Sequence, residues 1–367
     1  MGQGGCGTDR QSGSHRVILM KREQKCSLVI ATRSSPLALA QAELVKRALM
    51  RLFPGRSVEL REIRTTGDHL QTASLANPDA SLPKGLFTKE LEVALLEGSA
   101  DLAVHSLKDL PTTLPDGLEL ISVLPREDVR DVLIYRDLQD VGRKPPAEEW
   151  SPGDRVVRGF RSGLRLNRLP SDAVIGTSST RRAAIITAEC PGIRTIPLRG
   201  SVGTRLAKLA GDPRMDATIL AAAGLRRLGL FVGPGSRLVP DPRRTLQSGV
   251  AVPEGLLGSV LDPEELLPAA GQGAIGIEIA SSNAEARNAV HALNHRNTWM
   301  AVTAERAFLR GVGGGCQSPI AAYARIVGHQ IHLRAAVLAA GGWKKAEIWG
   351  ASGDAEKLGA ALALRVL

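Results

Sequence analysis

The chain has 367 residues, of which 43% are hydrophobic and 23% charged, so it is long enough for two or three domains with cores of their own. Its net charge of +10 favours an anionic partner. Aromatic residues make up only 3%, which argues against a stacking surface for single-stranded nucleic acid, and no run approaches the ~18 apolar residues of a membrane span. The cysteines Cys6, Cys26, Cys190 and Cys316 form no CxxC pair, which indicates neither a zinc site nor a disulfide framework and fits a reducing cytoplasm.

The first elements alternate between strand and helix. Residues 1–26 are polar and glycine-rich, with an apolar run too short for a signal peptide, and we expect a disordered leader. The pattern then predicts a strand at 27–31, a helix at 37–53, a strand at 58–64, a helix at 87–96 and a short buried strand at 102–104.

Three more strand–helix units follow, at 173–175 with 178–189, 195–198 with 202–209, and 217–220 with 223–228. This alternation predicts an α/β protein with parallel sheets, whose ligands bind beyond the carboxyl ends of the strands. From about residue 297, one helix, three alternating strand-like runs and a last helix predict a small α+β unit.

Residues 137–171 break this pattern with proline, glycine and charge, which indicates an insertion or linker. Its arginines recur at helix-like spacing with no acid among them: Arg155, Arg158, Arg161, Arg165 and Arg168. A solvated basic face is the simpler interpretation, and contact with RNA or another polyanion is the alternative.

Cations and hydroxyls gather where predicted strands end. Helix N-termini attract anions, and guanidinium groups bind carboxylates in pairs of hydrogen bonds. One such turn is typical of an ordinary helix cap. Several in successive units favour a cleft for a molecule with many carboxylates or phosphates. The residues concerned are Arg33, Ser35, Thr177, Ser178, Ser179, Arg181, Arg182, Arg199, Gly200, Arg205 and Arg227.

Three other segments carry candidate chemistry. Asp109 follows Lys108 after a buried strand, so it is either part of a surface salt bridge or a group that stabilises a cation and handles a proton. Gln272, in a glycine turn, is equally compatible with ligand contact and with a structural role. Glu305 and Arg306 are expected to serve packing and pairing within their helix. No histidine has metal-ligand spacing, and no metal site is predicted.

Cys316 follows three glycines, Gly313 to Gly315, at the end of a predicted helix. Glycines without side chains would let a ring or backbone approach the thiol closely. A glycine-rich turn that ends the helix explains the same residues, and the cysteine by itself does not decide between the two interpretations.

Together these motifs resemble the porphobilinogen deaminase (hydroxymethylbilane synthase) family. The resemblance runs from about residue 27 to the C-terminus and rests on segments 31–41, 66–68, 85–91, 104–111, 176–182, 199–205, 269–278 and 304–319. Departures from the family pattern are Ser201 for asparagine, Thr180 for leucine and an altered sequence at 311–313.

The resemblance implies a transferase of tetrapyrrole and haem biosynthesis. Cys316 would hold a dipyrromethane cofactor through a thioether. Four porphobilinogen molecules would be joined to it head to tail with loss of ammonia, and hydrolysis would release hydroxymethylbilane. Asp109 would be the catalytic carboxylate, stabilising the cation left by deamination.

The resemblance also implies which residues bind. Those for the cofactor are Ser106, Lys108, Thr177, Ser178, Ser179, Arg181, Arg182, Gly200, Arg205 and Gln272; those for substrate carboxylates are Arg33, Ser35, Arg199 and Arg227.

The family fold implies two α/β domains like those of periplasmic binding proteins and a small C-terminal α+β domain with the cysteine. We expect the first at 27–126 and 272–293, the second at 127–271 and the third at 297–367. We also expect a cytoplasmic monomer whose partner is a small-molecule substrate rather than nucleic acid or membrane. The alternatives are a non-catalytic binding protein for a small anion and a nucleic-acid binder.

Overall fold

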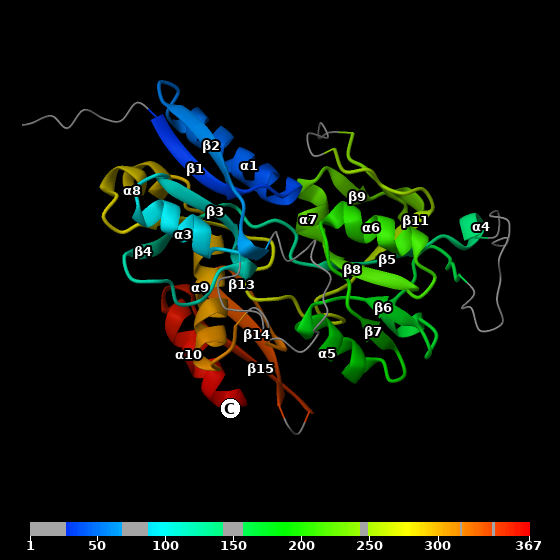
Figure 1. Ribbon diagram of the computed structural model, residues 1–367. Coiled ribbons are helices and arrows are strands. Elements are labelled where there is room, and N and C mark those ends of the chain that lie inside the picture. The colour runs from blue at the N-terminus through cyan, green and yellow to red at the C-terminus, as the bar shows by residue number, and fades with distance from the viewer. Residues whose placement is uncertain (1–26, 68–86, 142–156, 243–248, 316–317, 340–341) are drawn as a thin grey trace, which may run out of the picture.

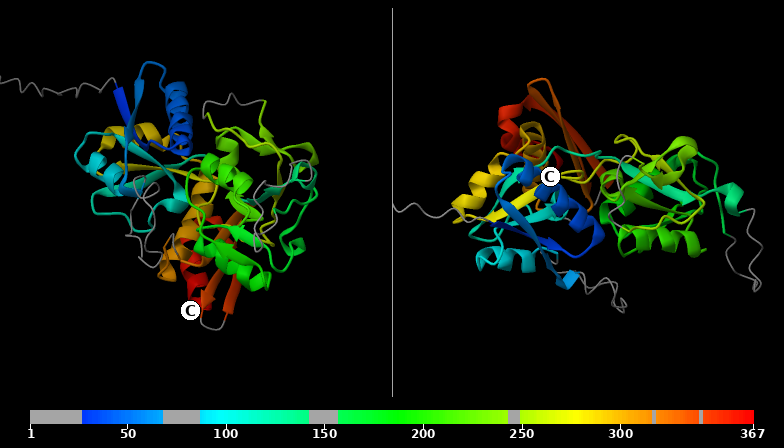
Figure 2. Two further views of the ribbon diagram at one scale, coloured as in Figure 1. Left: turned by 45° about the vertical axis from the view of Figure 1, so that its right-hand side comes forward. Right: turned by 90° about the horizontal axis from the view of Figure 1, so that it is seen from above.

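The computed structural model describes residues 27–67, 87–141, 157–242, 249–315, 318–339 and 342–367. Three larger sheets, each with its own helices, and one two-stranded hairpin make up the described chain (Figure 1). The first two lie side by side, and the C-terminal sheet with its helices packs beside them (Figure 2).

The first sheet has the strand order β2-β1-β3-β12-β4. Its strands are β1 (Ser27–Arg33), β2 (Ser57–Ile63), β3 (Leu102–Ser106), β4 (Leu118–Val123) and β12 (Ile275–Ala280). Helices α1 (Pro36–Leu52) and α8 (Ala284–His291) share an apolar core with one face of this sheet, and α3 (Lys89–Leu96) packs in a separate core on the other. Such two-sided cover explains why β3 and β12 are almost wholly buried; their buried polar residues His105 and Glu278 pair with each other at 2.8 Å.

The second sheet has the order β11-β5-β8-β6-β7. Its strands are β5 (Asp131–Arg136), β6 (Val174–Gly176), β7 (Arg194–Ile196), β8 (Ala217–Ala221) and β11 (Leu256–Val260). Helix α5 (Thr180–Glu189) packs in one core, and α6 (Val202–Gly211) and α7 (Ala222–Arg227) pack in the other. The hairpin of β9 (Leu230–Val232) and β10 (Leu238–Pro240) lies beside it, and short α4 (Leu138–Val141) follows β5.

The α/β class is confirmed, but the prediction of parallel sheets is only partly right. Strand β12 runs antiparallel to β3 and β4, and β5 runs antiparallel to β8 and β11. The chain crosses from the first sheet to the second at 124–130, directly before β5, and returns at 261–274, directly before β12. Each of these two strands therefore begins at the side of its sheet that is nearer to the other sheet. Periodicity alone does not reveal that crossing.

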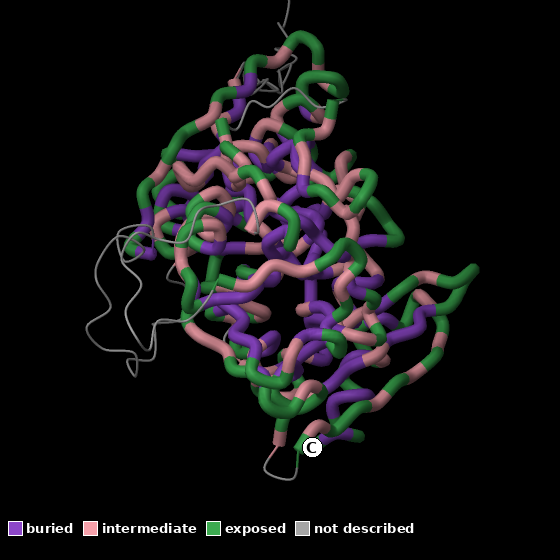
Figure 3. Tube along the Cα trace, turned by 90° about the vertical axis from the view of Figure 1, so that its right-hand side faces the viewer, coloured by how far each residue is buried: buried purple, intermediate pink, exposed green. Residues whose placement is uncertain are grey.

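The C-terminal unit is the antiparallel sheet β13 (Ile320–Val327), β14 (Gln330–Ala339) and β15 (Gly342–Ala351). Helices α9 (Arg296–Gly311) and α10 (Ala355–Val366) cover one face through Phe308 and Leu362. The other face contacts helix α5 of the second sheet, where the Trp343 indole N–H donates to the Ala184 carbonyl at 3.3 Å. Buried stretches of the chain lie mainly in the interior of the molecule, and exposed stretches lie on its outside (Figure 3).

The described part of 137–171 contributes to the second core. Leu166 and Leu169 are buried there. Two of its arginines form ion pairs: Arg158 with Asp216 at 2.7 Å, and Arg165 with Glu265 at 2.6 Å. These contacts give Arg158 and Arg165 a structural use. Arg155 lies outside the described residues, as does the leader at 1–26.

Candidate active site

The first component of the site is the turn after β3. A single 3-10 turn, Leu107–Asp109, leaves Asp109 exposed and Lys108 half-buried. Leu107 and Leu110 anchor the turn to the protein core, because both are buried in one apolar cluster. The ammonium of Lys108 lies 3.4 Å from Oε1 of Gln272, and the Ser106 hydroxyl accepts a hydrogen bond from the Gln41 amide at 2.8 Å.

The hydroxyl turn after β6 shapes the start of α5. Oγ of Ser179 caps this helix by accepting from the Arg182 backbone N–H at 3.4 Å, and Oγ1 of Thr177 accepts from the Ser179 N–H at 3.2 Å. Oγ of Ser178 accepts from the Leu198 N–H at 3.0 Å. The hydroxyls of Thr177 and Ser179 therefore act in turn formation and capping, as the simpler interpretation of this motif predicts, while that of Ser178 ties this turn to the segment after β7.

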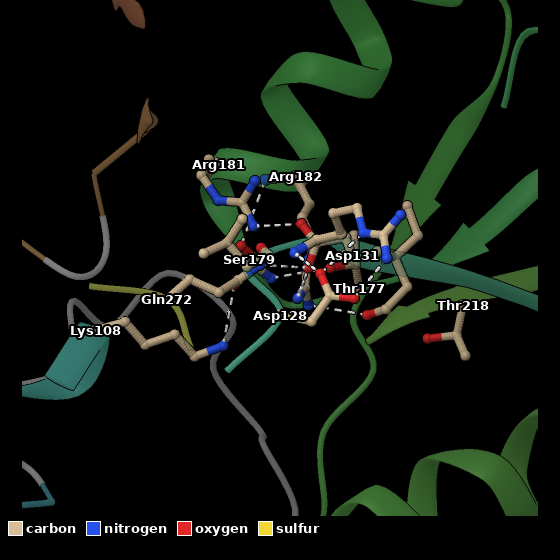
Figure 4. Close-up of polar contacts among 12 residues, drawn as sticks. Lys108, Asp128, Asp131, Thr177, Ser179, Arg181, Arg182, Thr218 and Gln272 are labelled. Carbon is tan, nitrogen blue, oxygen red and sulfur yellow. Dashed lines mark hydrogen bonds and ion pairs between the residues drawn. The ribbon is translucent and has the colours of Figure 1, made fainter. Parts of the chain in front are cut away.

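Arg181 and Arg182 converge on Asp131, the first residue of β5 (Figure 4). Their guanidinium groups lie 2.9 and 2.6 Å from its two carboxylate oxygens, and the Gln272 amide donates to Asp131 at 3.0 Å. Burial alone would raise the pKa of Asp131, but the two adjacent guanidinium groups hold it well below its ordinary value.

Arg182 is 5% exposed, and it also donates to the Ile219 carbonyl at 2.9 Å. Its Nε is buried and has no hydrogen-bond partner among the described residues. A buried donor without a partner is costly, and a bound anion would satisfy it.

The third component is the turn into α6. Gly200 has φ of +119°, and a Cβ there would lie 2.7 Å from Cγ2 of Thr204, so the turn requires glycine. The Gly200 carbonyl accepts from Nε of Arg205 at 2.8 Å. Ser201, one of the departures from the family pattern, caps α6 by accepting from the Thr204 N–H at 3.2 Å.

These turns form one cationic cluster, which we define as Lys108, Arg182, Arg199 and Arg205 around Asp109. Burial lowers the pKa of Lys108 to about 8, with Asp109 opposing the shift and Arg182 adding to it. Burial also lowers the pKa of Arg205 to about 10, where Arg182 and Arg199 add to the shift and Asp109 again opposes it. The charges of Arg182 and Asp109 therefore act on both Lys108 and Arg205, and that of Arg199 acts on Arg205.

Arg33, Ser35 and Arg227 contact the framework beside this cluster. The Arg33 guanidinium lies 4.3 Å from the centre of the Phe87 ring, and Oγ of Ser35 caps α1. Arg227 donates to the Gly273 carbonyl at 2.5 Å. Leu37 of α1 packs in the core that contains α7, so all three residues lie near the junction of the two sheets.

Cys316 lies outside the described residues. Its flanks are held to each other, since the Gly315 N–H donates to Oγ of Ser318 at 3.1 Å and the Ser318 N–H donates to the Gly315 carbonyl at 3.0 Å. No group of three or more potential metal ligands occurs in the part of the chain that the structure describes.

Two buried acids at the junction of the three units did not emerge as site residues from the sequence. Glu305 binds Arg126 through both oxygens, at 2.7 and 3.0 Å, and accepts from the backbone N–H groups of Gly271 and Ala324. The expected pairing within its helix was therefore wrong. The second buried acid is Asp131. In the sequence, Asp131 is indicated only by being a charged residue at the border of an apolar run, and Glu305 only by its place on the apolar face of α9.

The donors and acceptors fit a ligand with several carboxylates and ring N–H groups. Half-buried cations and the unpartnered Nε of Arg182 suit the carboxylates, while the exposed carboxylate of Asp109 is an acceptor suited to the ring N–H groups. The fold is that of an α/β protein, and these groups suit a small polyanion as ligand.

Comparison with protein families gives two matches: "Porphobilinogen deaminase, dipyromethane cofactor binding domain" over residues 28–288 and "Porphobilinogen deaminase, C-terminal domain" over 299–367. The chain belongs to the porphobilinogen deaminase family. It is a transferase that uses a dipyrromethane cofactor to condense four porphobilinogen molecules into hydroxymethylbilane with release of ammonia.

Solved structures add little to this assignment. YhfZ from Shigella flexneri is 14% identical (TM-score 0.32, 77% of this chain and 89% of that one), and OxyR of Corynebacterium glutamicum is 16% identical (0.37, 74% and 67%). The effector-binding domain of BenM with benzoate is 14% identical (0.33, 72% and 92%). TM-scores this low support no argument. The described residues contain no helix long and apolar enough to cross a membrane.

Proposed function

We propose that Asp109 stabilises positive charge and moves protons during the condensation, and that the cations around it hold carboxylates. The observation that carries this proposal is the placement of one exposed carboxylate next to the half-buried cations Lys108 and Arg205. A carboxylate in that position accepts from pyrrole N–H groups and stabilises a cation developing on the substrate.

The dipyrromethane, when bound, supplies the terminal pyrrole to which each new unit is joined. Cys316 would hold it through a thioether. Lys108 and Arg205 would bind its carboxylates directly. Arg181 and Arg182 have most of their donors committed to Asp131 and backbone carbonyls, so they would contribute mainly charge and the free Nε of Arg182. Ser106, Thr177, Ser178, Ser179, Gly200 and Gln272 would shape the cofactor site. The residues that would bind incoming porphobilinogen are Arg33, Ser35, Arg199 and Arg227.

We also propose that the enzyme is a cytoplasmic monomer. One chain supplies every element of the described site, and the scattered cysteines suit a reducing compartment.

The test is Asp109→Asn, which removes the charge and keeps the shape. It should retain the covalent cofactor and bind porphobilinogen, while turnover falls by about 100-fold or more, the size expected for removing a general acid–base group. Exposed Asp116, further along the same loop, gives the control Asp116→Asn, which should turn over normally. Near-normal turnover by Asp109→Asn would refute the role.

A further inference from the structure

Arg306 on α9 holds the backbone directly after Asp109. Its side chain is buried, at 9% exposure. Nη1 donates to the Leu110 carbonyl at 3.0 Å and Nη2 to the Pro111 carbonyl at 2.7 Å. A planar guanidinium that binds two successive carbonyls fixes their orientation as well as their position.

Apolar packing acts at the same place. Val302, four residues before Arg306 on α9, shares a buried cluster with Leu107 and Leu110, which flank Lys108 and Asp109. An apolar side chain could fill the space of Arg306 without the cost of burying a charge. Burial does lower the pKa of Arg306, to about 10. What the arginine adds over an apolar residue is control of backbone geometry.

The same helix leads to the cofactor cysteine. Helix α9 ends at Gly311, five residues before Cys316, and Arg306 lies about 7.5 Å before that end at the α-helical rise. Glu305, its neighbour, binds Arg126 and the Gly271 N–H in the two segments that cross between the sheets. One rigid element therefore contacts the Asp109 turn, both crossing segments and the start of the cysteine loop.

We propose that Arg306 is a positioning residue that fixes the Asp109 turn relative to α9 and the crossing segments, and so governs turnover rather than substrate affinity. This inference rests on the role proposed for Asp109.

The test compares holoenzymes carrying Arg306→Gln, Arg306→Lys and the control Arg310→Gln. Arg310 lies one turn later on α9, is exposed and pairs with Glu356 of α10, within the C-terminal unit. Arg306→Gln should keep the two-pyrrole adduct and a KM for porphobilinogen within about threefold, while kcat falls by roughly 100-fold, the effect of a ~1 Å misplacement. Arg306→Lys should recover part of kcat, and Arg310→Gln should match the parent.

A double variant separates positioning from a general structural role. In an Asp109→Asn background, Arg306→Gln should reduce kcat little further, because both changes act through one group. A full additional loss would overturn the proposal, as would parental kcat per folded molecule in Arg306→Gln. If Arg306→Gln does not fold, the test rests on Arg306→Lys, because lysine lacks the planar guanidinium group. A kcat of Arg306→Lys equal to that of the parent would overturn the proposal.

The two proposals fail in different ways. Normal turnover by Asp109→Asn removes the role of Asp109. Normal turnover by the Arg306 variants, with Asp109→Asn inactive, removes only the positioning role.

Discussion

Oδ1 of Asp131 accepts a hydrogen bond from Arg182 at 2.6 Å, and both side chains are buried. Asp131 also binds Arg181 and the Gln272 amide, so one carboxylate joins α5 to the segment that crosses between the sheets. Asp131→Asn would leave two buried guanidinium groups without their counter-charge. We expect a loss of about 3–5 kcal/mol in the free energy of unfolding, measured by urea denaturation. Glu43→Gln, which breaks a helical surface pair with Arg47, should cost only about 0.3–0.5 kcal/mol; equal losses would contradict the account.

Lys108 should make cofactor loading sensitive to pH. Its pKa is lowered to about 8, so its positive charge is present below that pH and is lost as the pH rises through it. Bound carboxylates would raise this pKa, so the test uses apoenzyme loaded with porphobilinogen and followed by intact mass. Loading should fall above pH 8, approaching tenfold per pH unit, and Lys108→Arg should keep loading at higher pH. The same decline in both proteins would mean that another group is responsible.

Gly273 holds the second crossing segment in a conformation that a side chain would disturb. Its φ is +86°, and a Cβ there would collide with the Glu127 carbonyl oxygen. Gly273→Ala should therefore destabilise the protein by more than the ~1 kcal/mol of left-handed backbone strain alone, and should lower turnover, because Arg227 binds the Gly273 carbonyl. Gly235→Ala is the matched control: φ is +64° but no atom lies within 4 Å. If thermal unfolding shows equal losses in both, the close approach is unimportant.

The sequence was sufficient for the elements and for the family, but not for the partners of the charged groups. Local periodicity predicts β1 and α1 to within about two residues, because each has a clear apolar pattern and Ser35 and Pro36 mark the start of the helix. Strand direction in β5 and β12 depends on where the chain crosses between sheets, which no local pattern encodes.

The same limit applies to the site. Arg182 and Arg205 follow β6 and β7, which adjoin in the second sheet, so their convergence is predictable from an α/β pattern. Asp109 follows β3 of the first sheet, and its approach to them depends on how the two sheets pack. The partner of Arg182 is Asp131, 51 positions away, and that of Glu305 is Arg126, 179 positions away. Pairing over such separations depends on the packing of whole sheets. The residue types in these motifs are compatible with either an exposed or a buried side chain.

The central claim is that Cys316 anchors a dipyrromethane next to this cationic cluster. Its most direct test is the intact mass of the protein purified from a host that makes porphobilinogen. We predict the mass of the chain plus two linked pyrrole units, and the unmodified mass for Cys316→Ala expressed in the same host. An unmodified mass for the parent protein, or an adduct that persists in Cys316→Ala, would contradict the account.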